Sequence, residues 1–196
     1  MAAITILKLS LMFISLVYAS GSAAAGAAVP TPSFIRSSCR TTRYPAVCVH
    51  SLTPYASTVH KSPRQLAMMA LSVSVKRAQS AKSFVAKLAK FHGLRPKESA
   101  AIKDCFEEVS ESVDRLSKSV KELKKSGRAG GPEFTWHMSN LQTWVSGALT
   151  DEGTCSDGFS GRAMNGKIKS SIRARMTNVA QVTSNALALC NHLVGN

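Results

Sequence analysis

The amino-acid sequence predicts an all-α protein: an antiparallel four-helix bundle preceded by a short, disulfide-stapled N-terminal helical hairpin. Apolar residues recur at three-and-four spacing along four long stretches, and no stretch alternates apolar and polar residues as a half-buried strand does. Short breaks rich in glycine and proline separate these stretches, and short connections are typical of antiparallel neighbours in a bundle. The same seams are compatible with a coiled coil between chains, but loops this short favour packing within one chain.

The expected helices follow one another with clear breaks. The hairpin occupies 33–56, where Tyr44-Pro45 separates two short helices because proline favours a turn or a first helical turn. The bundle lies within 64–195, and 151–161 is expected to be a loop. The second bundle helix has a strict heptad seam, spaced 4, 3, 4, 3, 4, 3. Its members are Ile102, Phe106, Val109, Val113, Leu116, Val120 and Leu123.

The N-terminal segment 1–29 has the pattern of a secretory signal peptide. Lys8 precedes an apolar run over 9–18, and small residues follow over 19–28, so cleavage is expected between 19 and 29. The apolar run is too short for a membrane span, which needs about 20 residues. The remainder, 30–196, is therefore expected to be one secreted, extracellular domain without a membrane segment, in a compartment where disulfides form.

The positions of the five cysteines agree with this topology. Cys39 and Cys48 flank the break in the hairpin, so a bridge between them would staple it. Cys105 lies near the start of the second bundle helix, and Cys155 lies just past the expected end of the third. These two points are neighbours in an antiparallel bundle, so the two thiols can meet. Cys190 is expected to be a buried free thiol, and the absence of C-x2-C spacing disfavours zinc.

The sequence contains no pattern typical of catalysis. There is no nucleophile elbow, phosphate-binding loop or zinc-protease motif. The acidic residues of the second bundle helix are interpreted as a solvated face, because basic residues follow at salt-bridge spacing. We therefore expect no catalytic residue, no metal and no cofactor, and interpret the protein as a binding module. The histidines are scattered along the chain: His50, His60, His92, His137 and His192.

Charge is distributed unevenly along the chain. The whole sequence carries 25 basic and 11 acidic side chains, a net charge of +14. All the acidic residues lie within 98–157, whereas 30–97 and 158–196 carry only basic ones. The hairpin and the first and fourth bundle helices should therefore form a positive side that binds an acidic polymer, while the other side faces a protein partner. Export and the lack of interleaved exposed aromatics argue against nucleic acid.

Several runs of residues resemble the plant pectin methylesterase inhibitor and invertase inhibitor family. The first runs are Phe-Ile-Arg-Ser-Ser-Cys at 34–39, with Tyr44-Pro45 and Cys48 after it, and Ala-Ile-Lys-Asp-Cys at 101–105. The most specific is Trp-Val-Ser-Gly-Ala-Leu-Thr at 144–150, followed by Thr-Cys-Ser-Asp-Gly-Phe at 154–159. Ser-Asn-Ala-Leu-Ala-Leu at 184–189 is similar too, so the resemblance spans about 33–193.

This resemblance implies a non-enzymatic protein of the plant cell wall, in the apoplast, that blocks an enzyme by forming a tight one-to-one complex with it. The family pairs its first cysteine with its second and its third with its fourth, which here means Cys39–Cys48 and Cys105–Cys155. In the pectin methylesterase branch, bundle helices cover the substrate cleft of the enzyme. Inhibition by steric occlusion needs no chemistry from the inhibitor.

The pectin methylesterase branch is favoured over the invertase branch. Invertase inhibitors resemble one another in a Pro-Lys-Phe segment that opens the third bundle helix, where this chain has Pro132-Glu133-Phe134 with the opposite charge. The Trp-x-Ser-x-Ala-Leu-Thr run resembles the pectin methylesterase branch. Inhibition of cell-wall or vacuolar invertase remains one alternative, and a wall protein that binds acidic pectin without inhibiting an enzyme is another.

The third bundle helix is expected to supply the contacts to the partner enzyme. Its periodicity turns Val145 and Ala148 inward and leaves hydroxyl residues on other faces. For Trp144, packing in the core is the stronger interpretation, and for Thr150 a role at the helix C-terminus competes evenly. The predicted contacts are Phe134, Thr143, Trp144, Ser146 and Thr150.

Overall fold

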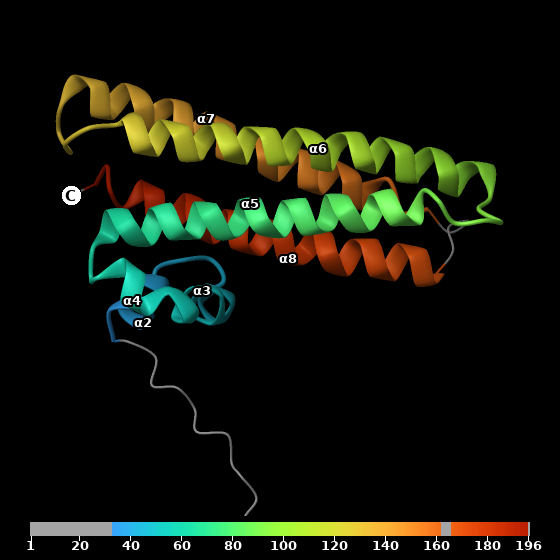
Figure 1. The fold of residues 1–196 in the computed structure, drawn as a ribbon, viewed down its shortest axis with the longest axis horizontal. Coiled ribbons are helices and arrows are strands. Elements are labelled where there is room, and N and C mark those ends of the chain that lie inside the picture. The colour runs from blue at the N-terminus through green and yellow to red at the C-terminus, as the bar shows by residue number, and fades with distance from the viewer. Residues whose placement is uncertain (1–32, 162–165, 196) are drawn as a thin grey trace, which may run out of the picture. The chain divides into compact units, whose positions relative to one another are not determined.

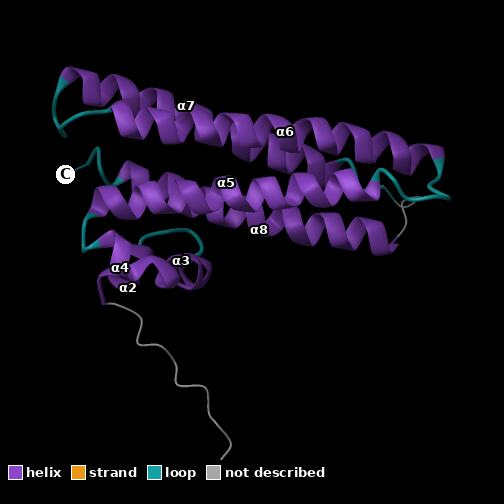
Figure 2. Cartoon of the chain, in the orientation of Figure 1, coloured by secondary structure: helices purple, strands orange, loops and turns teal. Residues whose placement is uncertain are grey.

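The computed structural model describes residues 33–161 and 166–195, and it confirms the predicted fold class. The signal-peptide prediction for 1–29 lies outside the described residues. Within the described part of the chain every regular element is helical, and none is a strand (Figure 2). The hairpin region contains α2 (Ser33–Cys39), α3 (Pro45–Leu52), the 3-10 turn η1 (Thr53–Tyr55) and α4 (Ala56–Val59). The bundle consists of α5 (Pro63–Leu88), α6 (Pro96–Lys125), α7 (Pro132–Asp157) and α8 (Gly166–Asn191).

The bundle is made of two antiparallel pairs of helices. Helix α6 lies along α7, and α5 lies along α8, so that the α6–α7 pair packs against the α5–α8 pair (Figure 1). Helices α2, α3 and α4 pack on α5 and α8, on the side away from α6 and α7 (Figure 1). Each pair therefore has its own outer face, and among the described residues the hairpin partly covers the face of the α5–α8 pair.

Local signals in the sequence set where the bundle helices begin. Helices α5, α6 and α7 each start with a proline, whose missing N–H costs nothing in the first turn. The Ser62 hydroxyl accepts a hydrogen bond from the Gln65 amide, which caps α5. At the start of α6, the buried carboxylate of Glu98 accepts bonds from both the backbone amide and the guanidinium of Arg95. These contacts satisfy backbone donors that would otherwise be unpaired.

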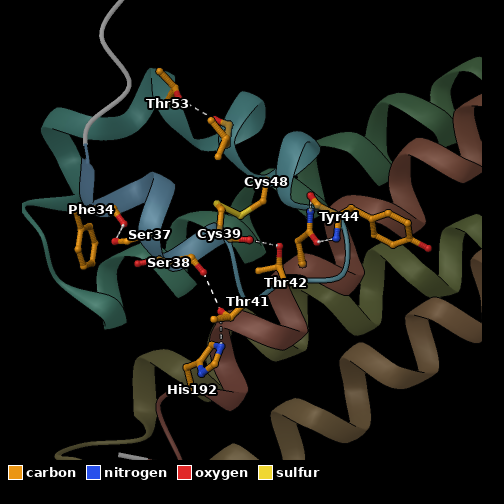
Figure 3. Close-up of a disulfide and its surroundings, with 12 residues drawn as sticks. Phe34, Ser37, Ser38, Cys39, Thr41, Thr42, Tyr44, Cys48, Thr53 and His192 are labelled. Carbon is orange, nitrogen blue, oxygen red and sulfur yellow. Dashed lines mark hydrogen bonds between the residues drawn. A yellow bond between two sulfur atoms is a disulfide. The ribbon is translucent and has the colours of Figure 1, made fainter.

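The hairpin is fastened both to itself and to α8. A disulfide joins Cys39 to Cys48, and the Thr42 hydroxyl donates to the carbonyl of Cys39 (Figure 3). The buried side chain of Asn185 accepts from the amide of Tyr44 and donates to its carbonyl, both at 2.9 Å. Because one side chain satisfies both backbone groups at the break, the Tyr44-Pro45 turn is held directly on α8.

Helix α7 is longer than the sequence predicts, because the expected loop over 151–161 is helical as far as Asp157. The heptad spacing of its buried positions continues beyond Ala148 through Glu152 and Cys155. Polar residues and Gly153 gave this segment the composition of a loop. The side chains of Asp151 and Glu152 are nevertheless buried and hydrogen-bonded within the bundle, which is why the helix continues.

The seam of α6 also differs from the predicted one. Ile102, Val109, Leu116 and Leu123 are buried as expected, but Phe106, Val113 and Val120 are only half-buried. The other innermost positions belong to small polar or sulfur-containing residues, namely Cys105, Ser112, Ser119 and Ser126. Serine hydroxyls can occupy these positions because they are hydrogen-bonded: that of Ser119 donates to the carbonyl of Leu116 at 2.7 Å, and that of Ser112 donates to Glu152 of α7 at 2.9 Å.

Two clusters of apolar side chains form the core, and each contains one disulfide. Cys39–Cys48 lies in the cluster between the hairpin and the adjoining end of the bundle. Cys105–Cys155 lies in the cluster at the other end. These are the two pairings expected from the sequence. Cys190 is a buried free thiol, and burial raises its pKa to about 12, so it is kept in the unreactive thiol form.

Candidate functional site

The outer face of α7 is unusual for a surface helix because it carries no lysine, arginine, aspartate or glutamate over most of its length. No lysine, arginine, aspartate or glutamate occurs over 134–150. Exposed hydroxyl residues repeat along this face at intervals of three and four, so they line up on one side of the helix. We call this set the hydroxyl stripe; it consists of Ser139, Thr143, Ser146, Thr150 and Thr154.

The threonines of the hydroxyl stripe are already hydrogen-bonded to their own helix. Thr143 donates to the carbonyl of Ser139 at 3.0 Å, and Thr150 donates to that of Ser146 at 3.2 Å. Their methyl groups and hydroxyl acceptor sites are left for a partner. Short side chains held in this way lose little conformational entropy when a surface binds, so the stripe suits a rigid, close-fitting contact.

A tryptophan that the sequence reasoning missed lies near the start of the same helix. Trp136 is 62% exposed, and its ring contacts that of His137 edge-on. It lies two residues from each of the buried positions Phe134 and Met138, which places it off the apolar seam. At 100° per residue, it shares a face with Thr143 and Thr150. The signal in the sequence is the position of this tryptophan off the apolar seam, where a side chain is expected to be exposed. Exposed tryptophans are enriched at binding hot spots.

The predicted contact residues separate into two groups. Thr143, Ser146 and Thr150 are exposed on the hydroxyl stripe. Trp144 is half-buried beside it, with the ammonium of Lys118 lying 4.8 Å from the ring centroid. Lys118 in turn pairs with Asp114 at 2.8 Å, so Trp144 is part of the packing between α6 and α7.

Phe134 has to be removed from the predicted contacts. It is 4% exposed and belongs to the core cluster that also contains Met138 and Leu141. The first turn of α7 places its side chain inward, in the same heptad register as those two residues. A buried phenylalanine in this position stabilises the bundle and is not accessible to a partner.

Ion pairs and a buried polar cluster hold α7 in place under the stripe. Arg115 of α6 donates to Asp151 at 2.9 Å, and His137 contacts Glu122 of α6 at 2.7 Å. Burial raises the pKa of Asp151, while the neighbouring Arg115 opposes that effect. These contacts join α7 to α6 at both halves of their length and make the presented face rigid.

The most deeply buried carboxyl group is that of Glu152, which is 1% exposed. Its Oε1 accepts hydrogen bonds from Ser112 of α6 at 2.9 Å and from Thr183 of α8 at 3.0 Å. Its Oε2 has no hydrogen-bond partner among the described residues. Burial raises the pKa of Glu152 from the ordinary 4.5 to about 7, in spite of the two donors. Glu152 therefore ties three helices together within the core.

The stripe ends at a cavity of about 480 Å³ between the start of α6 and the end of α7. Thr154 of the stripe lines it, together with Asp104, Glu108 and Asp157. Burial raises the pKa of Glu108, and the nearby charge of Asp151 adds to that effect. The Cys105–Cys155 bridge forms part of the wall, so this end of the surface is covalently fixed.

The described residues contain no group of three or more histidine, cysteine, aspartate or glutamate side chains placed to hold a metal ion. None of the helices in the same ranges combines the length and the apolarity needed to cross a bilayer. The described surface includes a helix face that is uncharged over 134–150, on a bundle with two disulfides. This is the arrangement that the sequence leads us to expect of a protein-binding module.

Residues 33–189 match the family described as "Plant invertase/pectin methylesterase inhibitor", and the chain belongs to this family. It is 54% identical over 169 residues to the "21 kDa protein" of Daucus carota, covering 86% of this chain and 88% of that protein. It is 56% identical over 161 residues to "Pectinesterase inhibitor 9" of Arabidopsis thaliana, covering 81% and 79%. The family expected from the sequence is thereby confirmed.

A solved structure has the same fold. It is the crystal structure of a mutant form of a pectin methylesterase inhibitor from Arabidopsis, with a TM-score of 0.64. The match covers 82% of this chain and 97% of that one, at 19% sequence identity. At that identity the likeness concerns the fold, a helical bundle of the kind described above.

Proposed function

We propose that this protein is a secreted, non-enzymatic inhibitor of pectin methylesterase that works in the plant cell wall. The observation that carries this proposal is its 54–56% identity to two Arabidopsis proteins named pectinesterase inhibitors, "Pectinesterase inhibitor 11" and "Pectinesterase inhibitor 9". Each of these alignments covers 81% of this chain. Close similarity of this extent favours the same kind of target.

The outer face of α7 is the proposed contact with the enzyme. The hydroxyl stripe and Trp136 supply an uncharged surface with one exposed aromatic anchor. A stable protein interface buries about 800 Å² on each partner, so the contact with the enzyme would extend to residues around the stripe. Laid across the substrate cleft in a one-to-one complex, this surface excludes the polymer by occupying its place. The inhibitor contributes shape and rigidity, and no bond is made or broken.

The residues at the start of α7 bear on the alternative function, which is inhibition of invertase. Glu133 is exposed in the first turn, next to the proline that begins the helix. A carboxylate at this position interacts favourably with the helix dipole, but it carries the charge opposite to that of the lysine in the Pro-Lys-Phe segment of invertase inhibitors. This difference supports the pectin methylesterase branch.

A second proposed contact is with acidic polysaccharide. Helices α5 and α8 contain only basic charged side chains, whereas all the acidic residues of the chain lie within 98–157. The uncompensated positive charge of this side supports attraction to a polymer with free carboxylates. Such a contact would leave the outer face of α7 free for the enzyme.

The test is a titration of the purified protein against pectin methylesterase and, separately, against cell-wall invertase. We expect inhibition of pectin methylesterase that saturates at one inhibitor per enzyme, and no inhibition of invertase. Thr150→Trp should weaken inhibition about tenfold or more because it places a bulky ring within the contact. The same substitution at the exposed Ser83 of α5 is the matched control and should leave inhibition unchanged.

Thermal unfolding of both variants separates a lost contact from a lost fold. The proposal requires an unchanged melting temperature together with weaker inhibition for Thr150→Trp alone. Equal inhibition by both variants would mean that the contact lies on another face. Inhibition of invertase, or of neither enzyme, would overturn the proposed target.

A further inference from the structure

A groove between α5 and α8 brings together two arginines with no acidic residue near them. It encloses about 380 Å³, within the range of roughly 300–1,000 Å³ typical of small-ligand sites. Arg77, Ser80 and Phe84 line it from α5, and Ser171, Arg175 and Asn178 line it from α8. The groove thus contains two cations and three uncharged hydrogen-bonding side chains.

Arg175 is held in a defined position in this groove. Its guanidinium carbon lies 3.9 Å from the centroid of the Phe84 ring, so that the ring supports the cation from one side. Stacking of this kind leaves the N–H groups at the edge of the guanidinium free to donate. Those donors match the two oxygens of a carboxylate. Because the side chain is already supported, less entropy is lost when a carboxylate binds.

The groove lies in the half of the α5–α8 face that the hairpin leaves open. The hairpin residues Cys48 and Leu52 pack near Ala70 and Val182, towards the start of α5 and the end of α8. The groove residues lie nearer the end of α5 and the start of α8, beyond the part of these helices that Cys48 and Leu52 contact. Among the described residues, neither Arg77 nor Arg175 forms a salt bridge with a carboxylate.

We infer that this groove binds the carboxylates of a uronic-acid polymer, with Arg77 and Arg175 on the acid groups and Ser80, Ser171 and Asn178 on sugar hydroxyls. The inference rests on the proposed contact with acidic polysaccharide and is independent of the inhibition of the enzyme. Base stacking as in nucleic-acid binding is disfavoured, because Arg175 already covers the Phe84 ring. The groove would retain the protein on pectin whose methyl esters have been removed.

The experiment measures binding of the full-length secreted protein to fully de-esterified polygalacturonate at low ionic strength, with fully methyl-esterified pectin as the comparison ligand. Three proteins are compared: the native chain, the groove variant Arg77→Gln/Arg175→Gln, and a control variant Lys87→Gln/Arg173→Gln. The control removes the same charge from the same two helices at exposed positions outside the groove. Inhibition of pectin methylesterase and the melting temperature are measured for all three.

We expect the groove variant to bind polygalacturonate about tenfold or more weakly, and the control less than about threefold, because only the groove offers paired contacts. A further variant, Arg77→Gln/Arg175→Lys, should bind nearly as weakly as the groove variant, since an ammonium lacks the planar fork. Equal losses in groove and control variants would overturn the inference and leave diffuse attraction by the basic side.

If the native chain binds esterified and de-esterified pectin equally, or binds neither, the proposed contact with acidic polysaccharide itself fails. A separate failure of inhibition would concern only the α7 surface.

Discussion

The α6–α7 pair carries charges of both signs, some of them paired within it, whereas α5 and α8 carry only basic charged side chains, and several of these lie over aromatic rings. Arg115 pairs with Asp151, and His137 contacts Glu122. On the other pair, the ammonium of Lys82 of α5 lies 5.3 Å from the ring centroid of Phe106 of α6, and Arg175 of α8 lies over Phe84 of α5. An aromatic ring holds a cation in place without neutralising it. The first pair is therefore built as a rigid surface, and the second as a source of positive potential.

The two pairs also differ in how they are joined. A disulfide links α6 to α7, while α5 and α8 are held together by packing and by the hairpin that lies across them. We take the difference to reflect two modes of binding. A close-fitting protein contact needs a surface that does not deform, whereas attraction to a charged polymer tolerates movement.

The largest effect is expected from removing the bridge within the α6–α7 pair. Cys105→Ala/Cys155→Ala opens a loop of 50 residues and should lower the free energy of unfolding by about 4 kcal/mol on the chain-entropy model. Cys39→Ala/Cys48→Ala opens a loop of nine and should cost about 2.5 kcal/mol. Urea denaturation of both variants measures the difference. A larger loss from the hairpin bridge would contradict the view that α6–α7 is the more firmly fixed pair.

The next effect concerns the buried Glu152, which links the α6–α7 pair to α8. Its pKa is raised from 4.5 to about 7 in the folded protein, so the folded state binds this proton more tightly than the unfolded state. Binding of this proton stabilises the folded protein by roughly 3 kcal/mol below pH 4.5. This stabilisation is lost as the pH rises to about 7. Glu152→Gln, which mimics the neutral acid, should remove this part of the pH dependence.

Urea denaturation between pH 4 and 8 checks this prediction. At pH 4 the native chain and Glu152→Gln should be nearly equally stable, and above pH 7 the variant should be the more stable one. Asp157→Asn, at an exposed carboxylate of the same helix, is the matched control and should not bring the gain in stability above pH 7 that Glu152→Gln brings. Parallel profiles for the native chain and Glu152→Gln would show that the buried carboxyl does not titrate in this range.

The smallest effect is expected from two glycine substitutions in α7. Comparing them tests how firmly Arg115 is held between α6 and α7. A Cβ added at Gly153 has no atom within 4 Å, so Gly153→Ala should stabilise the protein by about 1 kcal/mol through helix propensity alone. A Cβ added at Gly147 lies 3.1 Å from the Arg115 side chain, so Gly147→Ala should gain less. Thermal unfolding compares the two. Equal gains would mean that Arg115 moves freely and that its pair with Asp151 contributes little.

Much of this architecture follows from local patterns in the sequence. The heptad spacing predicts the bundle helices, and the positions of the cysteines predict which ends lie together. The predicted seams fail where polar residues are buried. Nothing local distinguishes Ser112 or Glu152 from a solvated residue, because their hydrogen-bond partners come from other helices. The same reason explains why the end of α7 was expected to be a loop.

The candidate surface was predicted only in part for a related reason. Periodicity places Thr143, Ser146 and Thr150 outward, since that depends on one helix alone. Whether an aromatic side chain is covered depends on its neighbours: Lys118 of α6 lies over Trp144, whereas Trp136 is exposed. The hydroxyl stripe is thus visible in the sequence, but its aromatic anchor is not.

By itself, the sequence determined the helical class, the order of the helices, the two disulfide pairings, the separation of charge along the chain and the family. Each of these depends on spacing or on composition within a short segment. The tertiary structure decided which polar groups are buried, which tryptophan is exposed, and that Arg77 and Arg175 line one groove although they are far apart in the chain. Those features depend on contacts between separate helices, and such contacts exist only once the bundle has formed.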